Sequence, residues 1–102
     1  MLAPGGYQAG TANLFLAMSL AKVGRTADAL SRIEAGMLFD HPSNRYLAAL
    51  THAEIGNSQE SVGFLRRAVE ERPFWIDLAV KDVGFERIRN SAEFTQLVEE
   101  LR

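Results

Sequence analysis

Few side chains in this 102-residue sequence are of types that carry out chemistry. There are two histidines, His41 and His52, and no cysteine, which excludes disulfides, thiolate metal sites and thiol nucleophiles. Neither histidine has a second metal-ligand residue at a useful spacing, and no phosphate loop, carboxylate pair or catalytic serine set stands out. We therefore expect His52 to pack in the core and His41 to lie in a solvated turn. The sequence predicts a protein that is not an enzyme and that uses no cofactor or metal.

The arginines Arg66, Arg67 and Arg72 are the candidates for a nucleic-acid-binding stripe. Glutamates are interleaved with them, and mixed charge of this kind is typical of a solvated helix face. The formal net charge of −2 gives no electrostatic reason to expect nucleic acid or an acidic membrane as partner. We expect neither, and a helix-turn-helix DNA binder or an all-α enzyme is the weaker alternative.

The apolar segments are too short to cross a membrane, because none approaches the ~20 apolar residues of a spanning helix. The apolar run over residues 12–21 lacks the basic flank and the cleavage site of a secretory signal. The absence of cysteine fits a reducing compartment. Together these features favour a cytoplasmic protein.

The elements that must position the remaining side chains are helices. Helix-favouring residues run from about residue 7 or 11 to residue 23, and Gly24 then predicts a helix end. Thr26 is the expected cap of a second helix that runs to about residue 39.

The same order of signals follows in the next segment. Ser43 is expected to cap a helix over residues 44–55, which ends at Gly56. Asn57 and Glu60 have the spacing of a capping box, with asparagine in place of serine or threonine, and predict a fourth helix to about residue 72.

The C-terminal part of the chain is less regular. We expect a short helix over residues 74–81, an interruption at residues 83–85 and one turn over residues 86–89. Asn90 and Glu93 have the spacing of another capping box before a final helix over residues 91–101. No strand alternation of useful length occurs, so the sequence predicts an all-α chain.

The two helical hairpins look like copies of one unit. The turn glycines Gly24 and Gly56, and the closing prolines Pro42 and Pro73, recur at close to the ~34-residue period of helix–turn–helix arrays. Small residues would let the helices of each hairpin approach closely, and larger ones would fill the grooves beside them. The expected small contacts are Ala17, Ala29, Ala49 and Ser61; the expected groove fillers are Leu20, Ile33 and Leu65; and Gly36 and Ala68 are expected to admit the next hairpin.

These positions have the spacing of the tetratricopeptide signature. In the first hairpin they are Asn13, Leu16, Ala17, Leu20, Ala29, Ile33 and Pro42, and in the second Arg45, Ala48, Ala49, His52, Ser61, Leu65 and Pro73. The chain therefore resembles the tetratricopeptide-repeat (TPR) family over about residues 13–73. Its tail, with Phe85, Ile88-Arg89 and Phe94, resembles the closing segment of many bacterial repeat proteins.

The resemblance implies antiparallel helical hairpins stacked as a short right-handed α-solenoid, in a single domain over residues 1–102. The first hairpin would span about residues 10–41 and the second residues 42–73. Residues 74–102 would form a partial third unit and a C-terminal cap. Apart from the resemblance, we expect the aromatic residues Phe74 and Trp75 to close the join between the second hairpin and the tail, and the alternative is that they are exposed and stack on a peptide.

The first helix is apolar on nearly every side, so more than one of its faces must be covered. The face with Leu16, Ala17 and Leu20 is expected to contact the second helix. The remaining apolar residues of this helix, and those at matching positions of the third helix, are then expected to line the inner, concave side. The predicted partner-binding residues are Leu14, Phe15, Met18, Lys22, Tyr46, Leu47, Leu50 and Glu54.

An apolar groove of this kind usually marks an interaction site. We expect a non-catalytic module that binds a protein or peptide partner, either free-standing or as the C-terminal part of a larger bacterial regulator. Lys22 alone does not make the carboxylate clamp of the chaperone-binding members of the family. Two alternatives remain: coverage of the groove by the chain's own tail or by another helix of a longer parent, and homodimerisation through the apolar first hairpin.

Overall fold

The computed structural model describes residues 6–38 and 41–102, and helices account for most of these residues. They are α1 (Gly6–Lys22), α2 (Thr26–Gly36), α3 (Pro42–Ile55), α4 (Ser58–Glu71), α5 (Phe74–Ala79), the 3-10 helix η1 (Val83–Ile88) and α6 (Ala92–Leu101). Neither described range contains a strand. The prediction of an all-α chain is confirmed.

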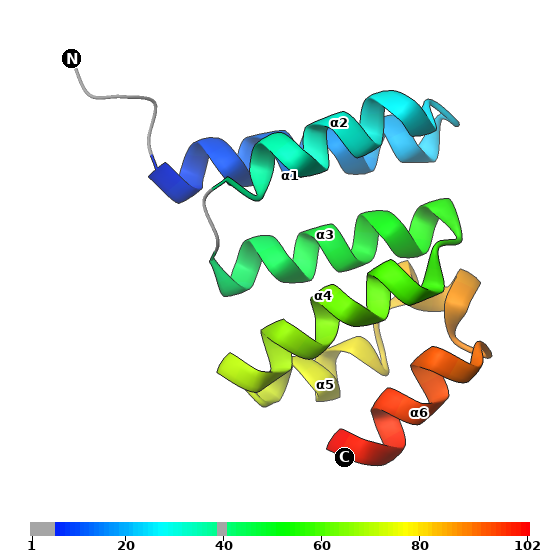
Figure 1. Cartoon of the computed structure of the whole chain (residues 1–102). Helices are drawn as coiled ribbons and strands as arrows, with labels where there is room; N and C mark the ends of the chain where they lie inside the picture. The colour runs from blue at the N-terminus through cyan, green and yellow to red at the C-terminus, as the bar shows by residue number, and fades with distance from the viewer. Residues whose placement is uncertain (1–5, 39–40) are drawn as a thin grey trace.

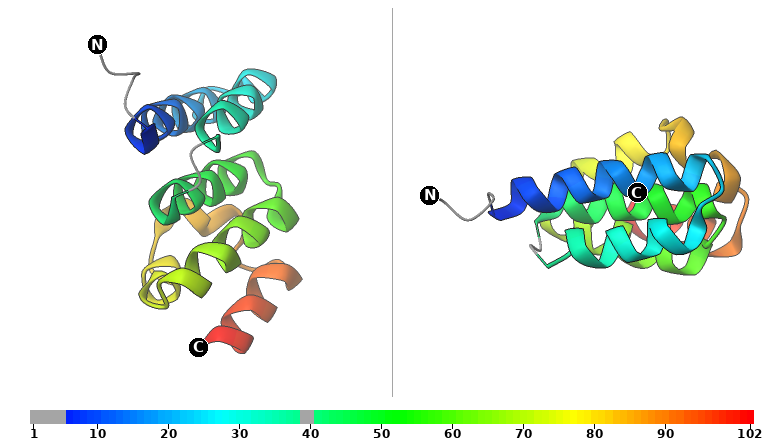
Figure 2. Two further views of the ribbon diagram at one scale, coloured as in Figure 1. Left: turned by 60° about the vertical axis from the view of Figure 1, so that its left-hand side comes forward. Right: turned by 90° about the horizontal axis from the view of Figure 1, so that it is seen from above.

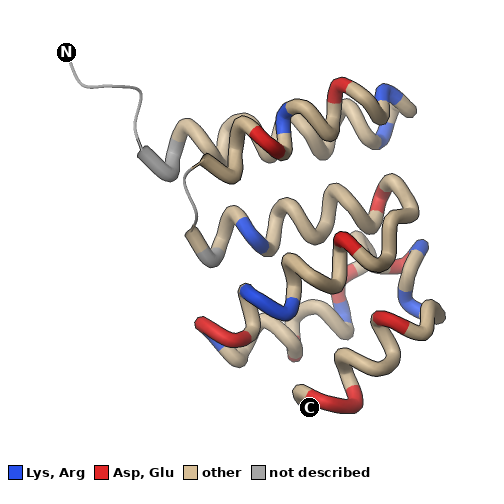
Figure 3. Tube along the Cα trace, viewed as in Figure 1, with Lys and Arg blue, Asp and Glu red and all other residues tan. Residues whose placement is uncertain are grey.

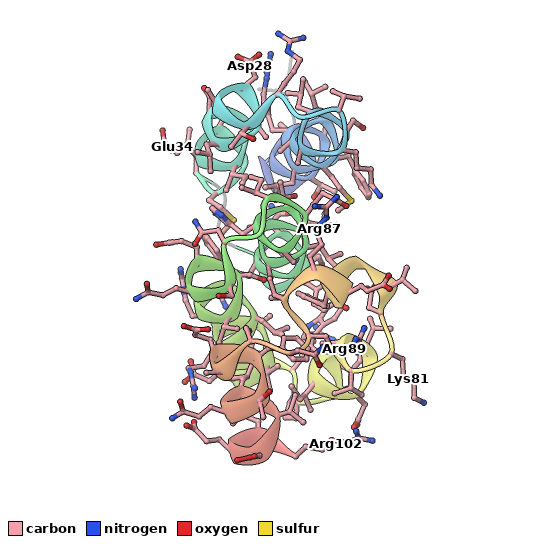
Figure 4. All side chains as sticks on the ribbon, turned by 90° about the vertical axis from the view of Figure 1, so that its right-hand side faces the viewer. Asp28, Glu34, Lys81, Arg87, Arg89 and Arg102 are labelled. Atoms are coloured by element: carbon pink, nitrogen blue, oxygen red, sulfur yellow. The ribbon has the colours of Figure 1, made fainter. Side chains whose placement is uncertain are left out.

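The helices form two layers. Helices α1 and α2 make one antiparallel hairpin, α3 and α4 make the next, and the tail folds back under the second (Figure 1). In Figure 4, α1, α3 and the α5–η1 segment lie on one side and α2, α4 and α6 on the other. We call these the inner and the outer layer.

Packing between the hairpins is mainly within the inner layer. Helix α1 packs along α3, and η1 packs on the other side of α3, whereas α2 touches the second hairpin mainly through α3. The hydroxyl of Thr11 donates a hydrogen bond of 2.6 Å to the side-chain oxygen of Asn44, which ties α1 to α3. The stack measures 46 × 30 × 18 Å, and its long and short dimensions are visible in Figure 2.

The turn glycines end their helices as predicted. Gly24 (φ 83°) and Gly56 (φ 90°) are the residues with positive φ in the described ranges. Side chains with a Cβ rarely adopt this conformation, which closes a helix by turning the chain away from its axis. These two glycines therefore fix the lengths of α1 and α3.

The predicted cap at Thr26 is wrong, and the predicted cap at Asn57 is right in position but lacks the side-chain hydrogen bond. Thr26 is already the first residue of α2, and Arg25 at the cap position forms an ion pair of 2.5 Å with Asp28 instead of a side-chain cap. Asn57 does stand at the cap of α4, but its side chain makes no cap hydrogen bond. Its backbone (φ −93°, ψ 79°) lies outside the extended conformation usual for a cap, so the capping box with Glu60 does not form.

The caps of α3 and α6 are each made by a neighbour of the predicted residue. His41 Nδ1, rather than Ser43, accepts a backbone hydrogen bond at the start of α3 (3.2 Å, from Ser43 N). His41 is thus half-buried in a cap and not solvated as expected. At α6, Ser91 Oγ accepts from the backbone N–H of Phe94 at 3.1 Å, and Asn90 lies outside the cap.

Small residues bring the helices of each hairpin together, as predicted. Ala17, Ala29, Ala49 and Ser61 are fully buried, and the Ser61 hydroxyl donates to the Ala49 carbonyl at 2.7 Å. For Gly36, the predicted neighbour is wrong. A Cβ at this position would lie 2.6 Å from Leu14 Cγ, so Gly36 admits α1 of its own hairpin and not the next hairpin.

Aromatic rings join the tail to α3. Trp75 stacks on Tyr46 with ring centroids 4.5 Å apart, and Phe85 meets Tyr46 edge-on at 5.6 Å. Phe74 stacks on Trp75 but is more than half exposed. Trp75 therefore closes the join between the second hairpin and the tail, as predicted for the pair, and Phe74 covers it from outside. Within the described ranges, no helix is long and apolar enough to cross a membrane.

Candidate partner-binding groove

Several of the predicted binding residues on the inner-layer helices α1 and α3 are exposed or half-buried. On α1 these are Phe15, Met18 and Lys22, which are spaced so that they share one helix face. On α3 the residues Leu47 and Leu50 are half-buried: Leu47 packs against the core cluster of Leu14, and Leu50 packs against the core cluster that includes the tail. We call the surface made by these exposed and half-buried residues the inner groove. Phe15 is its most exposed large apolar side chain on α1, with 55% of its area open to solvent.

Leu14 is not part of the inner groove, which corrects its prediction as a binding residue. The side chain is fully buried and contacts α2, where the missing Cβ of Gly36 leaves room for it. Leu14 belongs to a core cluster with Ala17 and Ile33 of the first hairpin and Ala48 of the second. The Leu14 side chain packs on the buried side of α1 and is not accessible to a partner.

Tyr46 is also buried, with 5% exposure, so it too is corrected from a groove residue to a core residue. Its hydroxyl donates a hydrogen bond of 2.8 Å to Asp82 Oδ2 at the start of η1. Burial, and next this hydrogen bond to a carboxylate, raise the pKa of Tyr46 far above its ordinary value. The side chain therefore holds the tail against α3 as a neutral phenol.

The tail forms one wall of the groove. Asp82 accepts a second hydrogen bond, from the backbone N–H of Gly84 at 2.9 Å, and so caps η1 while it holds Tyr46. The guanidinium of Arg89 donates to the carbonyl oxygens of Val80 and Asp82, which fixes the turn before η1. Gly84 then lies so close to Leu50 that a Cβ would be 2.4 Å from Leu50 Cδ2. The tail thus covers Leu50 in part and leaves Phe15 open.

Charged groups from three elements meet at one end of the groove. Glu54 of α3, mostly buried, lies 3.8 Å from Lys22 Nζ of α1 and 3.0 Å from Arg87 Nε of η1. Both cations are largely exposed, so this end carries two accessible positive groups around one shielded carboxylate. Figure 4 labels Arg87 on the inner-layer side of the molecule. Elsewhere acidic and basic residues are mixed over the hairpins and the tail (Figure 3).

Arg87 is the groove residue that sequence reasoning missed. Its partner Glu54 lies on another element, and only the return of the tail along α3 brings the two together. No local spacing indicates such a contact. The resemblance of the tail to a closing segment was the one available signal, since a closing segment must return to the preceding hairpin.

A second open surface lies at the free end of the stack, between α1 and α2. A cleft of about 440 Å³ is lined there by Leu16, Leu20, Arg25, Asp28, Ser31, Arg32 and Ala35. Leu16 was expected to pack within the hairpin but is 42% exposed, and Leu20 is half-buried. Arg32 donates to the side-chain oxygen of Asn13 at 3.1 Å and crosses from α2 to α1 beside the cleft.

His52 is buried, as predicted, with its ring stacked on Phe64 at a centroid distance of 5.6 Å. Its Nδ1 atom has no hydrogen-bond partner among the described residues. Burial lowers the pKa of His52, and nearby Glu60 opposes this shift, so the ring is neutral at pH 7. The described residues contain no group of three or more histidine, aspartate or glutamate side chains placed to hold a metal ion.

Comparison of the chain with models of protein families, with curated proteins and with solved structures finds no match in any of the three. The inner groove combines an exposed aromatic side chain on α1, half-buried leucines on α3 and the cations Lys22 and Arg87 around Glu54.

Proposed function

We propose that this chain is a TPR-like protein-interaction module whose inner groove holds an apolar segment of a partner protein. The observation that carries the proposal is the exposure of Phe15 on α1, together with half-buried Met18 on the same helix and half-buried Leu47 on the neighbouring helix α3. Support for the TPR-like arrangement comes from the repeated hairpins, their buried small contact residues and the two-layer order. We infer a non-catalytic, cytoplasmic role, either alone or as the C-terminal part of a larger regulator.

The mechanism is capture by a preformed surface. The helices on both sides of the groove are held by their own cores, so binding orders few groups of the protein and costs little conformational entropy. Covering the exposed half of the Phe15 ring contributes about 1 kcal/mol, since full burial of such a side chain is worth about 1.5–3 kcal/mol. Lys22 and Arg87 favour a partner with an acidic side chain next to its apolar residues.

Two neighbouring substitutions on α1 test the proposal. Phe15→Glu places a charge in the groove, and Leu16→Glu places the same charge about 100° around the helix, in the cleft at the free end. Both side chains are exposed, so both variants should keep wild-type helicity by circular dichroism. Quantitative affinity capture should show partner proteins lost with Phe15→Glu and kept with Leu16→Glu. Equal capture by both variants would reject the groove.

Homodimerisation is the second candidate, and the cleft between α1 and α2 favours it. Leu16 is 42% exposed in this cleft, and Leu20 lines it as a half-buried side chain. Two copies that met there would bury these side chains across a two-fold axis. Light scattering behind a sizing column distinguishes the cases: a monomer across micromolar concentrations rejects the dimer, whereas a dimer abolished by Leu16→Glu and kept by Phe15→Glu supports it.

A further inference from the structure

The outer layer has an apolar cleft of its own, between α2 and α4. Helix α1 packs along α3, whereas α2 contacts the second hairpin mainly through α3. The side chains of the two outer helices, α2 and α4, therefore leave a gap between them. A cleft of about 310 Å³ opens there, with His52 of α3 among its lining residues. This volume is at the small end of the ~300–1,000 Å³ of ligand clefts and suits one large side chain better than a whole helix.

The apolar part of the lining is contributed by both outer helices. Leu30 and Ile33 come from α2, Met37 is the residue that follows its last turn, and Phe64 comes from α4. Ile33 is nearly fully buried, Met37 and Phe64 are half-buried, and Leu30 is more than a third exposed. The cleft therefore has a buried apolar base and an accessible apolar edge.

The charged part of the lining is acidic. Glu34 of α2 and Glu60 of α4 are exposed carboxylates that belong to the lining, which contains no lysine or arginine. Arg67 lies over the Phe64 ring, 5.8 Å from its centroid, and is outside the lining. Figure 4 labels Glu34 on the outer-layer side and Arg87 on the opposite side, so the acidic cleft and the cationic end of the inner groove face different directions.

We propose that this cleft is a second docking site, for a partner segment that presents an apolar side chain next to a lysine or arginine. The apolar side chain enters between Leu30 and Phe64, and the basic group is held by Glu34 and Glu60 from the two helices. Charge complementarity selects this occupant, since an acidic segment would meet two like charges. The site is independent of the inner groove, which is on the other layer and takes a partner of opposite charge.

The test is a titration followed by amide chemical shifts in ¹⁵N-labelled protein. The probe is a short acetylated and amidated peptide in which leucine and phenylalanine are flanked by lysines, and its counterpart carries glutamates in their place. The lysine peptide should shift amides over residues 30–37 and 60–64, and the glutamate peptide should not. The double variant Glu34→Lys with Glu60→Lys should weaken binding of the lysine peptide about tenfold or more. The double variant Glu70→Lys with Glu99→Lys, on exposed glutamates outside the cleft, changes the net charge equally and should leave the affinity unchanged.

Several results would overturn the proposal. They are equal binding of the two peptides, no shifts in the cleft at millimolar peptide, or equal loss of affinity in the two double variants. Self-association that shifts the same amides without peptide would assign the cleft to a second copy. Protection of these amides by further residues of a longer parent chain would assign it to that chain.

Discussion

The close approach of α1 and α2 can be tested with two glycines that lie inside helices. Gly63, in α4, has no atom within 4 Å of the position a Cβ would take. Gly10, in α1, would place its Cβ 2.5 Å from the carbonyl oxygen of Gly36 and 2.9 Å from the side-chain nitrogen of Asn44. Alanine is about 0.8–1 kcal/mol more favourable than glycine inside a helix. The two Gly→Ala substitutions therefore gain the same helix propensity, and they differ in what the new methyl group contacts elsewhere in the fold.

The two substitutions should change the free energy of unfolding in opposite directions. Gly63→Ala should stabilise the protein by about 0.5–1 kcal/mol, since nothing opposes the helix-propensity gain. In Gly10→Ala the Cβ is roughly 1 Å short of van der Waals contact with a backbone oxygen, which no rotamer change relieves. Helix α1 must move away from α2, and overpacking of this kind costs about 1–3 kcal/mol. After subtraction of the propensity gain, Gly10→Ala should destabilise the protein by up to about 2 kcal/mol.

Urea unfolding followed by circular dichroism at 25 °C measures both changes. For a domain of this size, 1 kcal/mol corresponds to a shift of about 4–8 °C in Tm, so thermal scans provide a second readout. If Gly10→Ala is as stable as Gly63→Ala, the two helices do not approach each other at Gly10 and Gly36 as described, and the account of the first hairpin is wrong.

Three further predictions concern the tail and the buried histidine. Gly84→Ala should cost about 1 kcal/mol, because its Cβ overlaps Leu50, and the cost should vanish in a Leu50→Ala background, as a double-mutant cycle in urea would show. Tyr46→Phe removes the hydrogen bond to Asp82 and should cost about 1.5 kcal/mol, measured by the fluorescence of the single tryptophan during unfolding. Burial lowers the pKa of His52 in the folded protein, so the histidine of the unfolded chain takes up a proton first as the pH falls below about 6.5. The free energy of unfolding should therefore decrease as the pH falls from 7.5 to 5.5. His52→Gln should make this dependence on pH flatter.

Each of these has a contradicting result. An equal cost of Gly84→Ala in both backgrounds would mean that the side chain of Leu50 is not what the new methyl group meets. A Tyr46→Phe protein with wild-type stability would show that the bond to Asp82 does not hold the tail. A pH slope in His52→Gln equal to that of the wild type would assign the slope to another group.

Local chemistry made the helix ends and the hairpin contacts predictable. Gly24 and Gly56 can end a helix whatever surrounds them, because their conformational freedom is a property of the residue itself. Caps were harder, because capping depends on backbone angles at the cap residue. His41 and Ser91 have extended backbone angles and cap their helices, whereas Ser43 already lies within α3 and Asn90 lies before the cap position of α6.

The binding face could be predicted only in part. Helical periodicity predicts that Phe15 and Met18 share a face of α1, and in the structure Phe15 is exposed and Met18 half-buried. Periodicity does not say which neighbour covers each face. Leu14 was assigned wrongly because Gly36 lets α2 approach it, and Tyr46 because the tail returns to α3 through Asp82. Both causes are contacts between segments distant in sequence, which no local pattern encodes.

The proposed inner groove is tested most directly by photo-crosslinking from within it. Benzoylphenylalanine placed at position 15 keeps an exposed aromatic ring in the groove, and at the neighbouring position 16 it lies in the cleft between α1 and α2. The account predicts that position 15 forms a covalent adduct with a partner protein, and that addition of Lys22→Glu with Arg87→Glu reduces its yield. A partner adduct from position 16 with none from position 15, or adducts only with a second copy of this chain, would contradict it.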